Sequence, residues 1–144
     1  MLRIVADANV VLKWIPAKNE EKVVEAREIY KMMMAEQLEV FAPTFLLLEV
    51  LNILANKRKT DPNVIRKVIK DLAKGKIKFV ELEIRKVSEI EKLVHKYRLT
   101  SYDALYLYLA KEKNCKLLTV DRQLLKLHDS TIDIGRLLKL LKTN

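Results

Sequence analysis

The sequence has 144 residues, of which half are hydrophobic and a third are charged, a balance typical of a folded globular chain. Its 28 lysines and arginines exceed its 19 acids, and the formal net charge of +9 favours a polyanion such as nucleic acid as a partner. The single cysteine, Cys115, excludes a disulfide framework and a four-cysteine zinc site. No apolar run approaches the roughly 20 residues that cross a bilayer, so we expect a cytoplasmic protein with no membrane segment.

Short apolar runs, several of them rich in β-branched residues, alternate along the chain with segments whose apolar positions recur at helical spacing. In chain order they predict a strand at 2–6, helices at 9–14 and 20–37, a strand at 39–42, helices at 44–57 and 61–75, a strand at 78–82, helices at 87–97 and 102–113, a strand at 116–120, a short strand near 132 and a helix after 135. We expect Asn9 and Ser101 to cap the helices that follow them.

Alternating strands and helices predict a parallel sheet covered by helices on both sides. The expected fold class is therefore α/β, a three-layer α/β/α sandwich with a central, mainly parallel sheet. The sequence shows no internal repeat, no low-complexity segment and no linker, so we expect one domain spanning residues 1–144.

Four acids stand in apolar surroundings, although an isolated buried carboxylate is costly and is normally paired or bound to a metal. They are Asp7, Glu49, Asp103 and Asp121. Asp7 and Asp121 follow predicted strands directly, and Asp103 lies in the first turn of a predicted helix, where the helix dipole favours negative charge. Ligands of open α/β sheets bind beyond the carboxyl ends of the strands, so we expect the acids to converge there.

Each acid also has a simpler structural interpretation. Asp7 could cap the helix after it, Asp121 could cap a turn, and Asp103 could support the start of its helix with Ser101. Glu49 fits such an interpretation least, because Phe45, Leu46 and Ile53 flank it on its helix. Four carboxylates crowded together repel one another and would stay partly protonated without a cation. Mg²⁺ prefers such oxygen ligands, which favours a metal site over four separate structural roles.

The four acids lie in motifs that together resemble the PIN domain family, in its order and at its usual spacing over nearly the whole chain. The motifs are Asp7-Ala8-Asn9 after the first strand, Pro43 with Glu49 and Asn52, Ser101-Tyr102-Asp103-Ala104 with Tyr106 and Ala110, and Leu118-Thr119-Val120-Asp121. No single motif is specific, but the four in series are. The compact length is most similar to that of VapC-type toxin nucleases.

This resemblance implies an endoribonuclease that hydrolyses RNA phosphodiester bonds with Mg²⁺ or Mn²⁺, and metal ligation and catalysis by Asp7, Glu49, Asp103 and Asp121. It also implies supporting roles for Asn9 and Thr119, an antitoxin protein as a partner, and a homodimer. Apolar residues such as Met32, Met33 and Met34 could supply the dimer surface.

Positive charge near the acids would serve an RNA substrate. Lys13 and Arg122 are close in sequence to Asp7 and Asp121, and either could contact the RNA backbone. A further basic region surrounds the predicted helix at 61–75 and comprises Lys57, Arg58, Lys59, Arg66, Lys67, Lys70 and Lys74. A solvated helix face would show the same pattern.

Two other functions remain open at this stage. The chain could be a PIN-type nuclease of RNA processing outside any toxin–antitoxin pair, or a non-catalytic RNA-binding module. A haloacid-dehalogenase-like phosphatase would need an aspartate at the position of Asn9, and a response-regulator receiver would need paired acids after its first strand. Neither His95 nor His128 lies near the acidic motifs, so we expect no histidine-based nucleophile.

Overall fold

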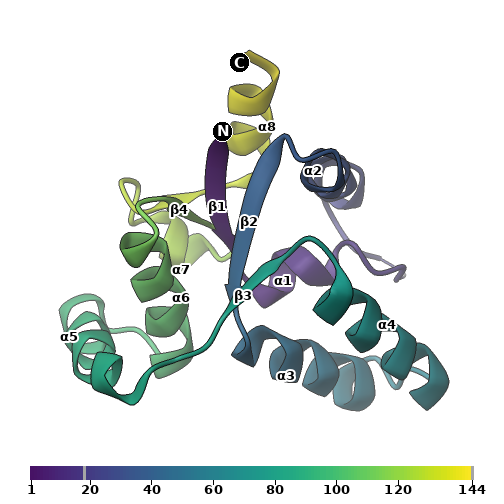
Figure 1. Ribbon diagram of the computed structural model, residues 1–144, viewed down its shortest axis with the longest axis horizontal. Coiled ribbons are helices and arrows are strands. Elements are labelled where there is room, and N and C mark those ends of the chain that lie inside the picture. The colour runs from purple at the N-terminus through teal and green to yellow at the C-terminus, as the bar shows by residue number, and fades with distance from the viewer. Residues whose placement is uncertain (18, 144) are drawn as a thin grey trace.

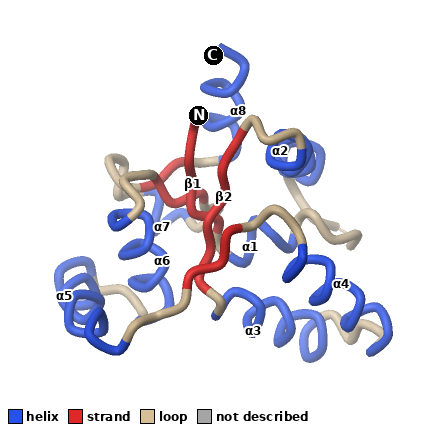
Figure 2. The backbone as a smooth tube through the Cα atoms, viewed as in Figure 1, coloured by secondary structure: helices blue, strands red, loops and turns tan. Residues whose placement is uncertain are grey.

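The computed structural model describes residues 1–17 and 19–143 (Figures 1 and 2). Its strands all run parallel in one sheet, in the order β3-β2-β1-β4-β5. Their bounds are β1 (Leu2–Ala6), β2 (Leu38–Pro43), β3 (Lys78–Val80), β4 (Lys116–Leu118) and β5 (Thr131–Ile132). The central strands are nearly continuous apolar runs, as expected for strands that are buried on both faces.

Helices connect successive strands, as parallel pairing requires. Their bounds are α1 (Ala8–Leu12), α2 (Val23–Met34), α3 (Phe45–Asn52), the π-helix η1 (Ile53–Lys57), α4 (Pro62–Lys74), the 3₁₀ helix η2 (Ile84–Lys86), α5 (Val87–Tyr97), α6 (Ser101–Glu112), α7 (Arg122–Leu125) and α8 (Ile134–Thr143). Among the described residues, no helix is long and apolar enough to span a bilayer.

The helices form a layer on each side of the sheet. On one side α6 packs against β1, β2 and β4, and α5 packs on α6. On the other side α2 contacts β2 and α8, and α1 lies between the sheet and the pair α3 and α4 (Figure 1). The expected α/β/α sandwich with a parallel sheet is therefore confirmed.

The strand order places a topological switch point in the middle of the sheet. From β1 the chain moves outward through β2 to β3, and then returns to the other side of β1 to form β4 and β5. Strands β1 and β4 are therefore neighbours, paired in register from Ile4 and Lys116 to Ala6 and Leu118. Ligands of open α/β sheets bind beyond the carboxyl ends of such a strand pair.

Two predicted helix caps were wrong by one or two residues. Helix α1 begins at Ala8, and its cap is Asp7, whose Oδ1 accepts the backbone N–H of Val10 at 3.0 Å. Helix α6 begins at Ser101, and its cap is Thr100, whose hydroxyl accepts the N–H of Asp103 at 3.2 Å. In both cases a residue with extended backbone geometry immediately before the helix has a side-chain oxygen that reaches the first free N–H groups.

Several element boundaries also differ from the prediction. Helix α2 starts at Val23 instead of residue 20, because Lys22 has a left-handed backbone conformation that an α-helix cannot contain. Strands β3 and β4 end two residues early. The short helices η2 and α7 were not predicted, since segments of three and four residues carry no helical periodicity.

Candidate active site

The carboxyl ends of β1 and β4 bring Asp7 and Thr119 side by side. Ala6 and Leu118 are register partners, and the N–H of Asp7 donates to the Leu118 carbonyl at 3.2 Å. Thr119 is fully buried, and its Oγ1 accepts the N–H of Asp121 at 3.1 Å. One threonine hydroxyl therefore connects the segments that carry the first and the last of the four acids.

Asp7 is the most buried of the four acids, with 8 % of its surface exposed. The pKa of Asp7 is raised to about 6, mainly by burial. Hydrogen bonds from Thr119 and from the Val10 N–H oppose this rise, and the charges of Glu49 and Asp103 add to it. The site thus penalises the ionised form of Asp7 until a positive charge arrives.

Asp103 lies in the first turn of α6, which packs on the strands that carry Asp7 and Thr119. Burial raises its pKa, the charge of Asp121 adds to that rise, and the Thr100 hydroxyl opposes it. Asp103 is therefore within electrostatic range of Asp7 on one side and Asp121 on the other.

Glu49 lies in the middle of α3 and is half-buried. Its Oε1 accepts the hydroxyl of Tyr106, a residue of α6, at 2.5 Å. Burial raises the pKa of Glu49, the Tyr106 hydrogen bond lowers it, and the charge of Asp103 raises it. The helix that carries Glu49 therefore faces the same space as the helix that carries Asp103.

Asp121 caps α7, and its Oδ1 accepts the N–H groups of Gln123 at 2.8 Å and Leu124 at 3.4 Å. The capping interpretation of Asp121 is therefore correct, and the same is true of Asp7. Capping occupies Oδ1 of each residue and leaves Oδ2 to other partners. A structural role and membership of an acidic cluster thus coexist in both side chains.

The four acids belong to one electrostatic cluster, which we name the acidic cluster: Asp7, Glu49, Asp103 and Asp121. Within residues 1–17 and 19–143 none of the four forms an ion pair. In the same part of the chain, no three His, Cys, Asp or Glu side chains are arranged to hold one metal ion. Mg²⁺ commonly binds through one or two carboxylates with waters and substrate oxygens completing its shell, so this all-oxygen donor set fits a hard divalent cation.

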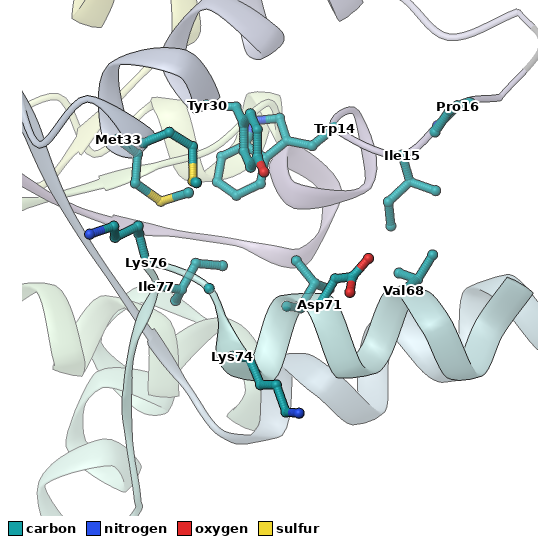
Figure 3. A pocket seen from close by; sticks show the side chains of 13 residues that line it. Trp14, Ile15, Pro16, Tyr30, Met33, Val68, Asp71, Lys74, Lys76 and Ile77 are labelled. Carbon is teal, nitrogen blue, oxygen red and sulfur yellow. The ribbon is translucent and has the colours of Figure 1, made fainter.

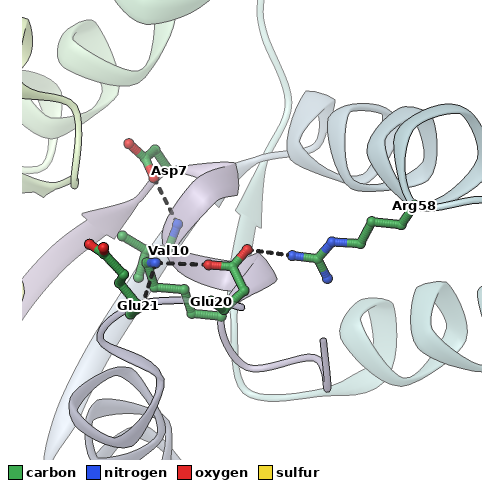
Figure 4. A network of polar contacts seen from close by, with 6 residues as sticks. Asp7, Val10, Glu20, Glu21 and Arg58 are labelled. Carbon is green, nitrogen blue, oxygen red and sulfur yellow. Dashed lines mark hydrogen bonds and ion pairs between the residues drawn. The ribbon is translucent and has the colours of Figure 1, made fainter. Parts of the chain in front are cut away.

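Of the two basic residues expected near the acids, Lys13 is engaged by protein groups. Its side chain is buried, and its ammonium donates to Glu20 at 3.0 Å and to the Glu21 carbonyl at 2.6 Å. Glu20 also pairs with Arg58 at 2.7 Å (Figure 4). The expected contact of Lys13 with RNA therefore does not fit this conformation, whereas Arg122 is exposed at the start of α7.

Asn9, expected to support the site, is exposed on α1, and its role stays a prediction. The methionine run does not form one exposed face, because Met33 is buried and Met32 half-buried, while Met34 is 44 % exposed. Sequence reasoning missed the contact of Tyr106 with Glu49. The signal available was its position three residues after Asp103, which places both on one helix face.

An apolar recess lies away from the acids. This pocket of about 400 Å³ is bounded by the chain after α1, by α2, by α4 and by the chain after α4, with Trp14, Tyr30, Met33 and Ile77 among its lining (Figure 3). Trp14 and Tyr30 pack as a tilted aromatic pair with ring centroids 5.3 Å apart. No member of the acidic cluster lines this pocket.

A family model described as PIN domain matches residues 4–129, a span that includes all four acids. The chain belongs to the PIN domain family. This PIN domain has no match among curated proteins.

Solved structures share the fold at low identity. A protein from Pyrobaculum aerophilum is 21 % identical with a TM-score of 0.75, over 99 % of this chain and 91 % of that one. A toxin–antitoxin complex from Klebsiella pneumoniae matches at 15 % identity and a TM-score of 0.59, over 82 % and 86 % of the two chains. VapBC2 from Rickettsia felis, bound to a DNA fragment from their promoter, matches at 12 % and 0.62, over 92 % and 97 %. These likenesses show the fold of this PIN domain.

Proposed function

We propose that this PIN domain is a nuclease that hydrolyses RNA phosphodiester bonds with a bound Mg²⁺ or Mn²⁺, as the toxin of a toxin–antitoxin pair. PIN domains are generally nucleases. The observation that carries the proposal is the acidic cluster, in which four elements bring carboxylates towards the carboxyl ends of β1 and β4, and none of these carboxylates forms an ion pair within residues 1–17 and 19–143.

The acidic cluster supplies the ligands in this proposal. Asp7, Glu49, Asp103 and Asp121 would hold one or two cations, each ion through one or two carboxylates, with Asp7 and Asp121 using the oxygen that capping leaves available. When bound, a divalent cation polarises the scissile phosphate and increases the acidity of water at the site. Binding also neutralises the repulsion among the acids, which favours the ionised form of Asp7 at neutral pH.

Other residues would fix the acids and attract the substrate. The hydroxyl oxygen of Thr119 accepts the backbone N–H of Asp121, and the same side chain contacts Asp7. Arg122 is exposed next to Asp121 and is the candidate for contact with an RNA phosphate. The basic residues of α4 and the net charge of +9 of the chain favour binding of an RNA backbone. Such contacts do not distinguish one RNA sequence from another.

Partners are proposed from the structural neighbours, one of which is described as a toxin–antitoxin complex. An antitoxin protein would bind this chain and suppress cleavage, and the nuclease would act in the cytoplasm as a homodimer. A PIN-type RNA-processing nuclease would share the same acidic cluster and would differ in lacking the antitoxin.

The decisive experiment compares RNA cleavage by the wild type, Asp7→Asn and Asp103→Asn with added Mg²⁺ or Mn²⁺. Both variants should lose cleavage by at least 100-fold while their circular dichroism spectra stay native. Asp61→Asn is a matched control, since Asp61 also caps a helix, α4, but is exposed and outside the acidic cluster. Cleavage that survives in both site variants would refute the assignment, and a wild type that binds RNA without cleaving it would favour a binding module.

A further inference from the structure

Tyr106 is a buried polar residue whose role follows from its place between two helices of the site. It lies one turn after Asp103 on α6 and is 2 % exposed. Its hydroxyl reaches across to α3 and donates to Oε1 of Glu49 at 2.5 Å. A buried tyrosine normally satisfies its hydroxyl, but here the partner is an acid of the proposed metal site.

The surroundings of Tyr106 keep its hydroxyl protonated. Burial raises its pKa, and the hydrogen bond to Glu49 and the charges of Glu49, Asp7 and Asp103 raise it further. The phenol is therefore a fixed donor inside a group of three carboxylates. A neutral donor lowers the electrostatic repulsion at Glu49 and leaves the negative charge of Glu49 available to a cation. A lysine at this position would neutralise that charge and compete with the cation for it.

Glu49 needs such a donor more than Asp7 and Asp121 do. Asp7 and Asp121 stand at helix starts, where free backbone N–H groups hold Oδ1 of each carboxylate. Glu49 stands in the middle of α3, where backbone N–H groups are used within the helix, and its side chain has one more rotatable bond. Only another side chain can fix its orientation.

We propose that Tyr106 is a positioning residue that holds Oε1 of Glu49, so that Glu49 presents a single oxygen, Oε2, to the cation of the acidic cluster. This inference rests on the proposed function. It assigns Glu49 as a one-oxygen ligand whose orientation is set by α6, the helix that also carries Asp103. Tyr106 thus couples the positions of two acids that come from different helices.

The first test measures Mn²⁺ affinity of the metal-free protein by calorimetry, without RNA. Tyr106→Phe removes one hydroxyl and keeps the ring, so the core packing and the melting temperature should change little. Loss of a hydrogen bond that orients a metal ligand should weaken Mn²⁺ binding by roughly 10- to 100-fold. Tyr108→Phe is the matched control, because Tyr108 lies on the same helix, outside the acidic cluster, and this variant should bind Mn²⁺ like the wild type.

A double-mutant cycle distinguishes positioning from a general structural effect. In a Glu49→Ala background, Tyr106→Phe should leave Mn²⁺ affinity unchanged within about twofold, because Tyr106 acts only through Glu49. An equal loss in both backgrounds, or no loss in the wild-type background, would overturn the inference while leaving the proposed function intact. Absence of Mn²⁺ binding by the wild type would overturn both.

Discussion

Replacing Asp7 with asparagine should stabilise the metal-free protein at neutral pH while removing its activity. The pKa of Asp7 is about 6 in the fold, against 3.8 for an unperturbed aspartate. One pKa unit corresponds to about 1.4 kcal/mol, so ionised Asp7 costs the fold about 3 kcal/mol. Asparagine carries no charge, and its Oδ1 still accepts the N–H of Val10, so the cap of α1 is kept.

The direction of the pH dependence follows from proton binding. Between pH 3.8 and about 6 the folded protein binds more protons at Asp7 than the unfolded chain does, so the stability of the wild type falls as pH rises through this window. Below the window Asp7 is protonated in both states and carries no penalty. The advantage of Asp7→Asn should therefore be near zero at pH 3.5 and complete above pH 6.

Urea unfolding of the metal-free proteins from pH 4 to pH 8 measures this difference. At pH 7.5 the variant should gain about 3 kcal/mol, equivalent to a melting temperature higher by on the order of 10 °C. Asp61→Asn should show no such pH-dependent gain, since Asp61 caps α4 at an exposed site. Saturating Mg²⁺ should stabilise the wild type and reduce the difference.

A result in which Asp7→Asn is no more stable than the wild type at pH 7.5, or gains equally at pH 4, would refute this reasoning. It would mean that the carboxylate of Asp7 is well solvated or paired, and that the acidic cluster carries no stored repulsion. The expected result would show that the ionised carboxylate of Asp7 costs the metal-free fold stability at neutral pH, a cost that a bound cation would offset.

Three further predictions test the surroundings of the site. Thr119→Val removes the hydroxyl that holds the Asp121 segment and contacts Asp7, so it should raise the pKa of Asp7 and lower RNA cleavage roughly tenfold, measured as a pH–rate profile. Glu20→Gln should cost about 1–3 kcal/mol in urea unfolding at pH 7, because the buried ammonium of Lys13 loses the negative charge paired with it. The pKa of Glu20 is lowered in the fold, so this cost should fade as the pH drops below the usual glutamate range. Lys70→Ala combined with Lys74→Ala should reduce the slope of log affinity for RNA against log salt by about 1 to 2 at unchanged melting temperature, and an unchanged slope would exclude α4 from the RNA contact.

The sequence predicted the order and type of the main elements, since each central strand is a nearly continuous apolar run and most α-helices keep their period over ten or more residues. The helix caps were harder to predict. Neighbouring residues such as Asp7 and Asn9, or Thr100 and Ser101, can all accept an N–H, and only the backbone conformation selects one. The helices η2 and α7 are too short to leave a pattern.

The sequence alone was enough to identify the four acids as candidate site residues. A carboxylate within an apolar run carries a desolvation cost and is normally paired or bound to a metal. Their surroundings were decided by the tertiary structure. That Lys13 turns away to Glu20, and that Tyr106 reaches Glu49 from a residue 57 positions distant, depends on which faces of α1, α3 and α6 meet. The burial of a residue can be predicted from the apolar residues around it in the sequence. A contact between side chains from separate elements forms only when the sheet brings those elements together, and in this sheet β1 lies beside β4.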